Sequence, residues 1–542
     1  GDKLTVQFNA NATADAVEHV IENLTYANTV SNPIASRTVS IRVTDGDGGA
    51  SEPRNVVINV TPETDGAVRY GLEKVVNTTV ASNQAEPSVA RLSDGGYVVV
   101  WEDQGGADGS SYGVYGQRYD VNDNAVGAQF RANNFTTGNQ YDAQVTGLNG
   151  GGFVVVWRGD NQDGSGTGVY GQRYDAAGVK AGGEFLVNTS TDQNQYQPSI
   201  AATADGGFVV AWYDDYYTDA GFTEYQDIFF QRYNATGVAQ GAETRANPTG
   251  EGTVNQSEPS IAALTGGGFV TLWTDASKDG SGAGVYAQRF AADGAANGGV
   301  LQVNSFITGA QHTPSVTGLK DGGFIAVWQS EGQDLSSTGI YGQRFDAAGA
   351  KVGAEFRVNT NINGQQYEPA VTALENGGWV VSWTDTSSTT YDVYVQQYNA
   401  AGQQVDGETR VNTYTPYVQY QPSIASMADG GFVVAYAGYI YSSDQTGDGI
   451  GDGGNDTYEI RLQRFSNTAP NVSNVTATGA EESVIVLSNT LFEGGFVDPD
   501  GQSLQAIKII TLPAEGTLRL NNVAVTTNQE ISLADLQAGA LT

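Results

Sequence analysis

Four aspartates spaced by four residues are the strongest candidates for metal ligands in this sequence. Asp444, Asp448, Asp452 and Asp456 lie in a segment that is otherwise rich in glycine. Calcium binds about six to eight oxygen ligands, and glycine lets carboxylates and main-chain carbonyls converge on one ion. The segment lacks the terminal glutamate of an EF-hand, so it is not that motif. The spacing therefore predicts a calcium site of another kind.

Shorter pairs of aspartates recur in other glycine-rich segments. Asp160 lies three residues before Asp163, and Asp275 lies four residues before Asp279. Carboxylates at this spacing in a tight loop could also bind calcium. Aspartate and glycine are equally the ordinary residues of solvent-exposed turns, so a purely structural role is the competing interpretation.

Tyrosines gather next to acidic residues in two segments. One segment holds Tyr216, Tyr217 and Tyr225, and the other holds Tyr439 and Tyr441. An aromatic ring can stack on the C–H face of a sugar while nearby carboxylates accept hydrogen bonds from its hydroxyl groups. These tyrosines are therefore candidates for carbohydrate binding, with packing between neighbouring loops as the alternative.

Residues for catalysis are scarce in this sequence. The chain has two histidines, His19 and His312, and no cysteine, which excludes a thiol nucleophile. It contains no Gly-x-Ser-x-Gly elbow, no His-Glu-x-x-His motif and no phosphate-binding loop. Aspartate is too frequent to single out an acid–base pair. The sequence therefore predicts a protein that is not an enzyme, and cleavage of a polysaccharide stays open as an alternative.

A repeated segment organises the middle of the chain. Two glycines followed by an alternating apolar stretch occur seven times, as in residues 206–212 (GGFVVAW). The alternation predicts a strand with one buried face, and each repeat holds four such short strands between turns rich in Gly, Asp and Asn. Seven repeats of four strands are typical of a β-propeller. The predicted fold is therefore all-β, with a seven-bladed propeller of four-stranded blades.

The ends of the repeat region predict how the ring closes. Val76, Asn77 and Thr78 match the outer strand of a repeat but stand before the first complete one. The last repeat ends at Phe465 and lacks an outer strand. A strand from the front of the ring would therefore complete the last blade, which would leave no unpaired sheet edge at the seam.

A glutamine recurs just before the innermost predicted strand of each repeat. In the ring these glutamines would encircle one mouth of the central channel, together with the residues two positions later. Gln140, Gln195, Gln366 and the later residue Glu368 are candidates for ligand binding. In the competing interpretation each glutamine bonds the main chain of the adjacent blade, since most side-chain hydrogen bonds go to main chain or water.

The composition limits the partners of the chain. It has 25 Lys and Arg residues against 60 Asp and Glu residues, so its formal net charge is −35. Such a chain repels nucleic acid and anionic membrane surfaces and is suited to binding cations. No apolar run is long enough for a transmembrane helix, so we expect no membrane insertion. We expect the chain to be a monomeric segment of a longer protein.

Residues 1–66 and 467–542 flank the predicted propeller of residues 67–466 and carry motifs of their own. The motifs are residues 26–29 (YANT), 43–49 (VTDGDGG), 467–470 (NTAP), 498–501 (DPDG) and 516–520 (GTLRL). They resemble the cadherin-like and immunoglobulin-like modules of bacterial repeats-in-toxin (RTX) adhesins. Both flanks look incomplete, so they are predicted to be partial β-sandwich modules. They are either two cut modules or two halves of one split module.

The resemblance implies a location, a cofactor and a role. Asp45, Asp47, Asp498 and Asp500 would bind calcium as cofactor and stiffen module junctions, unless they form charged hairpin turns. The location would be extracellular, at the bacterial cell surface. We therefore expect a non-enzymatic, calcium-stabilised ligand-binding or spacer segment of a secreted adhesin, for cell adhesion or biofilm attachment, with surface glycans or proteins as partners. A carbohydrate-binding propeller and a polysaccharide-degrading propeller enzyme are the alternatives.

Overall fold

The computed structural model of the chain describes most of the repeat region and parts of both flanks. The described residues are 36–41, 54–59, 68–440 except 79–81, 108, 110, 192–193, 218–223, 249–254, 335–336, 389 and 415–416, then 457–466 and short stretches between 471 and 542. The chain divides into two compact units, Gly66–Ser466 and a second unit of Gly1–Asp65 with Asn467–Thr542. Each unit is described by itself.

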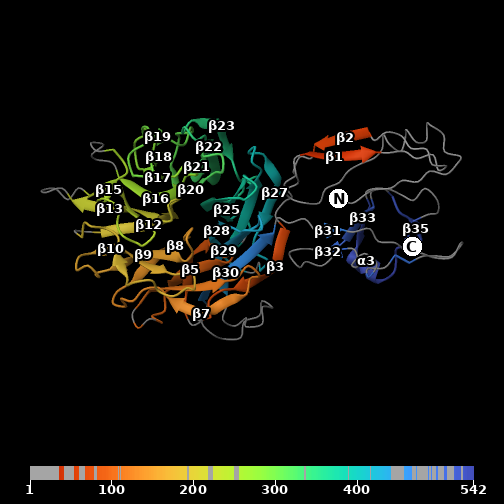
Figure 1. The fold of residues 1–542 in the computed structure, drawn as a ribbon, viewed down its shortest axis with the longest axis horizontal. Helices are drawn as coiled ribbons and strands as arrows, with labels where there is room; N and C mark the ends of the chain where they lie inside the picture. Colours follow the sequence, from red (N-terminus) through yellow and green to blue (C-terminus); the bar gives the residue numbers. More distant parts are fainter. Residues whose placement is uncertain are drawn as a thin grey trace. The chain divides into compact units, whose positions relative to one another are not determined.

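The unit Gly66–Ser466 is a β-propeller of seven blades, each an antiparallel sheet of four strands (Figure 1). This confirms the all-β, seven-bladed prediction.

The strands are grouped here by their place in the blades. The first and innermost strands are β4 (Gln84–Arg91), β8 (Gln140–Gly147), β12 (Asn194–Ala202), β16 (Gln256–Ala263), β20 (Gln311–Gly318), β24 (Gln366–Ala373) and β28 (Gln419–Ser426). The second strands are β5 (Tyr97–Asp103), β9 (Phe153–Asp160), β13 (Phe208–Tyr217), β17 (Phe269–Asp275), β21 (Phe324–Glu331), β25 (Trp379–Asp385) and β29 (Phe432–Ile440). The third strands are β6 (Gly113–Tyr119), β10 (Thr167–Tyr174), β14 (Glu224–Tyr233), β18 (Gly284–Phe290), β22 (Thr338–Phe345), β26 (Asp392–Tyr398) and β30 (Thr457–Ser466). The outer strands are β7 (Ala125–Arg131), β11 (Phe185–Leu186), β15 (Thr244–Arg245), β19 (Leu301–Gln302), β23 (Lys351–Arg357), β27 (Gln404–Arg410) and β3 (Val68–Val75).

The hydrophobic core of the ring lies between consecutive blades. Seven clusters of buried residues each combine side chains of two neighbouring blades. At the interface of blades 1 and 2, Val98 and Val100 pack with Phe153 and Trp157. All seven tryptophans are buried, which explains why the second strand of each blade reads as a nearly continuous apolar run.

The Gly-Gly pair before each second strand is required by a close approach of main chain. A Cβ atom at Gly207 would lie 2.1 Å from the carbonyl oxygen of Tyr233, on the third strand of the same blade. Any larger residue would force this hairpin apart.

The ring closes through the first strand of the unit. β3 pairs with β30, so blade 7 has the order β28-β29-β30-β3. Figure 1 shows β3, in orange, beside β30, in blue. This confirms the predicted closure, with the strand at Val68–Val75, directly before the motif that indicated it.

A β-bulge interrupts every innermost strand at the same place. In blade 1 the pairing with β5 shifts between Ala85 and Ser88. The extra residues include one with positive φ, between 46° and 56°, although none of them is glycine. We call these seven the ring residues: Glu86, Asp142, Gln197, Glu258, Thr313, Glu368 and Gln421. Bulges of this kind re-aim a side chain, and here they direct the ring residues toward the channel.

The second unit holds short antiparallel pairs in its described parts. The pairs are β1 (Ser36–Ile41) with β2 (Arg54–Asn59), β31 (Asn471–Val472) with β32 (Phe496–Val497), β33 (Ala506–Ile509) with β36 (Gln529–Ser532), and β34 (Arg519–Leu520) with β35 (Val523–Ala524). A short helix, α3 (Leu533–Gln537), contributes Leu536 to a small core with Ile531 and Leu541. Among the described residues, no helix has the length and apolar character needed to cross a membrane.

Candidate functional site

A cavity of about 370 Å³ lies where the seven bulges meet. The seven ring residues line it, together with the residues that follow them in the innermost strands. Four of the seven carry a carboxyl group, namely Glu86, Asp142, Glu258 and Glu368. No lysine, arginine or histidine is among the residues that line the cavity. The cavity is therefore acidic, and its charge must be balanced by hydrogen bonds, protons or a ligand.

On one side of the cavity two carboxylates accept hydrogen bonds, although burial still raises the pKa of Glu368. Glu258 accepts a hydrogen bond from the main-chain N–H of Thr313 and another from the hydroxyl of Thr274, both at 2.7 Å. Glu368 has the same two kinds of donor, the N–H of the next ring residue at 2.9 Å and the hydroxyl of Thr384 at 3.1 Å. Each of these carboxylates therefore joins its blade to the next one.

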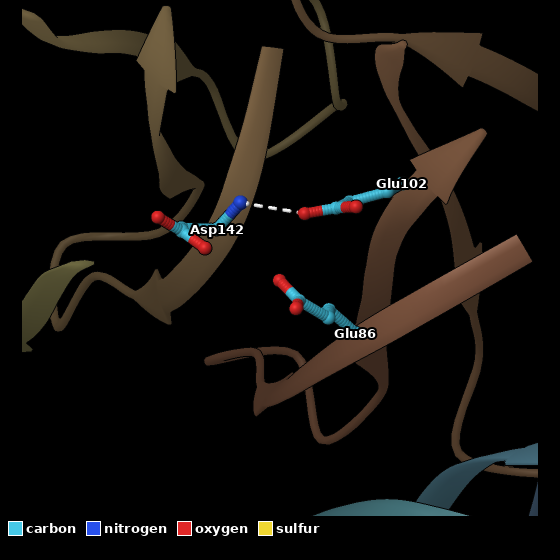
Figure 2. Close-up of side chains that lie close together, drawn as sticks. All are labelled: Glu86, Glu102 and Asp142. Carbon is cyan, nitrogen blue, oxygen red and sulfur yellow. Dashed lines mark hydrogen bonds between the residues drawn. The ribbon is translucent and has the colours of Figure 1, made fainter. Parts of the chain in front are cut away.

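On the other side three carboxyl groups converge between blades 1 and 2 (Figure 2). Glu86 comes from β4, Glu102 from β5 and Asp142 from β8, and their carboxylate oxygens lie within 4.8 Å of one another. Glu102 is 2% exposed and accepts a hydrogen bond from the main-chain N–H of Asp142 at 2.7 Å. We call these three side chains the carboxyl cluster.

Burial and mutual repulsion raise the pKa values of the cluster. Burial, followed by the negative charge of Glu102, raises the pKa of Glu86 to about 8. Burial also raises the pKa of Glu102. Burial raises the pKa of Asp142 to about 6, although the guanidinium of Arg158, with Nε 3.3 Å from the carboxylate, lowers it. At neutral pH Glu86 therefore holds a proton beside the lower-pKa carboxyl group of Asp142.

The carboxyl cluster is also suited to a hard cation. Among the residues that the structure describes, it is the one group of three metal-ligating side chains with such closely spaced donor atoms. Three carboxylates and nearby water could bind calcium, which prefers oxygen ligands. A bound cation would hold all three groups ionised and lower their pKa values.

The predicted glutamines do not line the cavity. Gln140, Gln195 and Gln366 are fully buried, because the bulge places the residue two positions later at the channel instead. Each accepts a hydrogen bond from an asparagine seven residues earlier: Asn133 at 2.8 Å, Asn188 at 3.0 Å and Asn359 at 3.0 Å. These hydrogen bonds join segments that are close together in the sequence. The glutamine side chains therefore do not surround the mouth of the channel. Of the predicted ligand-binding residues, Glu368 does line the cavity.

Each aspartate pair spans the end of a second strand and the turn after it, and its carboxylates accept hydrogen bonds there. Asp160 accepts bonds from the side chains of Asn139 and Tyr141, and Asp163 from the N–H of Ser165. Asp275 accepts bonds from the N–H groups of Ser277 and Lys278, and Asp279 from that of Ser281. Neither pair belongs to a group of three closely spaced metal-ligating side chains in the described part of the chain. Calcium binding by these pairs stays a prediction.

Several predicted residues lie outside the described residues. These are Asp444, Asp448, Asp452, Asp456, Asp45, Asp47, Asp498, Asp500 and Tyr441. Tyr216 and Tyr217 end β13, but their side chains are not among those described. Tyr225 is half-buried on β14, and Tyr439 packs against Tyr417 and Tyr458 on blade 7.

Sequence reasoning missed Glu102 and Arg158, although a pattern marks them. On the second strand of each blade, one residue directly follows the aromatic that closes the apolar stretch. It pairs with the residue just before the ring residue, and its type varies between blades. In chain order these residues are Glu102, Arg158, Tyr213, Thr274, Gln329, Thr384 and Ala437. A charged residue stands there only in blades 1 and 2, which are the blades that form the carboxyl cluster.

No protein-family model and no curated protein sequence matches the chain. Several solved structures have a similar fold. An α-L-arabinanase from Penicillium chrysogenum complexed with arabinobiose is 14% identical with a TM-score of 0.40, over 73% of this chain and 98% of that one. An α-L-arabinofuranosidase from Fusarium graminearum is 12% identical with a TM-score of 0.39, over 74% and 97%. The polysaccharide lyase Uly1 is 11% identical with a TM-score of 0.44, over 74% and 100%. At these identities the likeness shows the fold alone.

The prediction that the chain is not an enzyme is contradicted by this comparison. The similar solved propellers include enzymes named for arabinan or polysaccharide cleavage. The prediction failed because no acid–base pair stands out among so many acidic residues in the sequence. The fold brings together three carboxyl groups that lie 16 and 40 residues apart along the chain, at positions 86, 102 and 142.

Proposed function

We propose that the propeller binds a polysaccharide at the cavity and hydrolyses its glycosidic bonds with Glu86 and Asp142. The observation that carries the proposal is the convergence of the carboxyl groups of Glu86 and Asp142 in one cavity, where burial raises the pKa of Glu86 to about 8 and that of Asp142 to about 6. Two carboxyl groups whose environments separate their pKa values are the requirement for acid–base cleavage of a glycosidic bond. The proposal rests on these side chains, and the names of similar solved propellers serve only to choose substrates.

The spacing of the carboxyl groups selects one of the two known routes. In enzymes that retain the anomeric configuration the carboxyl groups are about 5 Å apart, and in inverting enzymes about 6.5–9.5 Å, which leaves room for a water molecule. One carboxylate oxygen of Glu86 lies within 4.8 Å of one oxygen of Asp142. This spacing is nearer to that of the retaining enzymes, so we propose the retaining route. Glu86 donates its proton to the leaving oxygen while Asp142 attacks the anomeric carbon. Glu86 then takes a proton from the water that releases the sugar.

Glu102 and Arg158 act through these two residues. Glu102 does not line the cavity, and its charge keeps the proton on Glu86. Arg158 favours the ionised form of Asp142, which is the form that attacks. Both are therefore positioning residues. Because the cavity lining carries four carboxyl groups and no basic side chain, the fitting substrates are neutral sugars rather than uronic acids.

The test is release of reducing ends from arabinan, galactan, xylan and β-glucan. We expect the full chain to cleave at least one of them and Glu86→Gln to lower the rate by about a thousandfold, as for loss of a general acid. Glu258→Gln, the matched change at a ring residue of blade 4, should retain most of the activity. No release from any of the four polymers, or an active Glu86→Gln variant, would overturn the proposal.

From the flanking motifs, we also propose a secreted RTX-type adhesin at the bacterial cell surface, with calcium as cofactor. Calorimetric titration of the full chain with calcium tests this part. Binding that survives Glu86→Gln would support calcium sites in the predicted aspartate motifs. The absence of any binding would leave those motifs as turns.

A further inference from the structure

Five tyrosines form a continuous row on blade 7. Tyr420 on β28 and Tyr458 on β30 have ring centroids 5.3 Å apart, and Tyr458 lies 5.0 Å from Tyr439. Tyr439 lies 5.9 Å from Tyr417, which lies 5.9 Å from Tyr414. All five residues are half-buried, and Tyr420 also packs against the hydrophobic core between blades 7 and 1. We call these residues the tyrosine row.

The tyrosine row begins beside the carboxyl cluster. Tyr420 directly precedes the ring residue Gln421, whose side chain accepts a hydrogen bond from the main-chain N–H of Glu86 at 3.2 Å. The main-chain N–H of Tyr458 donates to the side chain of Asn83, just before the innermost strand of blade 1. Burial, then Tyr458 and the nearby glutamates, raise the pKa of Tyr420, in keeping with this position.

The repeat does not require Tyr439. Its position is held by Gln104, Asp160, Asp215, Ala276, Glu331 and Thr386 in the other six blades, which have the same four strands. The position of Tyr420 also holds tyrosine in blades 2, 3 and 6, so Tyr439, rather than the whole row, is the addition of blade 7. The row is also more extended than one monosaccharide requires, because it links five rings in sequence, beginning with Tyr420 next to the ring residue Gln421.

We propose that the tyrosine row binds successive sugar residues of a neutral polysaccharide chain that enters the cavity at Tyr420. This inference rests on the proposed function and names the binding surface of the same site. Each ring offers a face or edge to sugar C–H groups, and each phenol hydroxyl can bond a sugar hydroxyl. A row of subsites favours cleavage within long chains, because remote contacts hold the polymer while the bond at the carboxyl cluster reacts.

The experiment measures binding separately from cleavage. The full chain carrying Glu86→Gln, which should bind without cutting, is run in native gels that contain arabinan, galactan, xylan or β-glucan. Into this background we introduce Tyr439→Ala or Tyr458→Ala. Tyr439→Phe and Tyr458→Phe keep the rings. Tyr112→Ala removes a half-buried tyrosine of blade 1 that makes an edge contact at 6.1 Å but lies outside the row. Thermal unfolding of every variant verifies the fold.

We expect at least one polymer to slow the migration of the chain that carries Glu86→Gln alone, which is the parent of the other variants. Each Ala variant should then weaken binding by about tenfold, equivalent to about 1.4 kcal/mol per ring. The Phe variants should keep most of the retardation, and Tyr112→Ala should keep all of it. Unchanged retardation of both Ala variants, or no retardation of the parent by any of the four polymers, would overturn the inference.

The two proposals can fail separately. If the unmodified chain cleaves nothing but the Ala variants lose retardation, the tyrosine row stands and the hydrolase does not. If Glu86→Gln abolishes cleavage but the Ala variants bind normally, the hydrolase stands and the row is overturned.

Discussion

In blade 4 the ring residue Glu258 faces Thr274, whereas in blade 1 the ring residue Glu86 faces Glu102. The main chain is the same in both blades, with the same bulge and the same positive φ. The threonine donates a hydrogen bond to its glutamate. In blade 1, burial, followed by the negative charge of Glu102, raises the pKa of Glu86 to about 8.

The comparison separates two roles of a carboxyl group, which are joining neighbouring blades and holding a proton for a reaction. A carboxylate at a ring position can bridge two blades, as Glu258 does with the N–H of Thr313. Such a role explains acidic residues around the channel without any ligand. The position directly after the recurring aromatic of the second strand lies outside this requirement. The combination of the residue there with its partner on the innermost strand is different in each of the seven blades. A change at that one position can therefore turn a structural carboxylate into a proton donor.

The largest expected effect concerns the dependence of stability on pH. The pKa of Glu86 rises from its usual 4.5 to about 8 in the folded chain, so the folded state binds this proton more tightly than the unfolded state. The resulting stabilisation is complete below about pH 4.5 and is lost as the pH rises through about 8. We expect a loss of about 3 kcal/mol in the free energy of unfolding, reduced from the full shift because the site is partly solvated.

Denaturant unfolding between pH 5 and pH 9 measures this effect. Glu86→Gln removes the titrating group, so its stability should change much less over the same window. If the free energy of unfolding depended on pH equally in the variant and in the unmodified chain, Glu86 would not hold the extra proton. Blades 1 and 4 would then not differ in this respect.

The second prediction converts blade 1 into blade 4. Glu102→Thr replaces the repelling charge with a hydroxyl donor, so the pKa of Glu86 should fall, although burial, the larger cause of its rise, remains. Less of Glu86 then holds a proton at neutral pH, and we expect the rate of polysaccharide cleavage at pH 7 to fall by up to about a hundredfold. The pH optimum should move to more acidic values, measured as rate against pH. An unchanged optimum would show that Glu102 does not control the proton.

The propeller could be predicted from the sequence because its requirements repeat. The Gly-Gly pair, the buried tryptophans and the closing strand recur or fall at fixed places, and each reflects a steric need that every blade shares. The carboxyl cluster does not repeat, since it forms once, from residues on three different strands. The bulge was also invisible in the sequence: the glutamines and the residues two positions later were both predicted at the channel, and only the later residues, such as Asp142, line the cavity. Comparing the blades position by position would have marked Glu102.

The third prediction concerns the partner of Asp142. Arg158→Gln removes the positive charge that lowers the pKa of Asp142, so this pKa should rise above about 6 and approach that of Glu86. Less of the attacking carboxylate is then present at neutral pH. We expect cleavage at pH 7 to fall by about tenfold and to recover in part at higher pH. Loss of activity that is the same at every pH would indicate that Arg158 instead supports the fold, because it also stacks over Tyr141 at 3.8 Å.

The smallest expected effect lies on the structural side of the comparison. Thr274→Val keeps the shape of the side chain but removes the hydroxyl that donates to Glu258. Because Thr274 is buried, we expect a loss of about 1–2 kcal/mol in the free energy of unfolding, measured by denaturant titration at constant pH. The rate of cleavage at pH 7 should not change, since this glutamate bridges blades and lies outside the carboxyl cluster. If Thr274→Val lowered cleavage as much as Glu102→Thr, the ring would have to act as one acidic unit. The contrast between blades 1 and 4 would then be a difference of degree rather than of role.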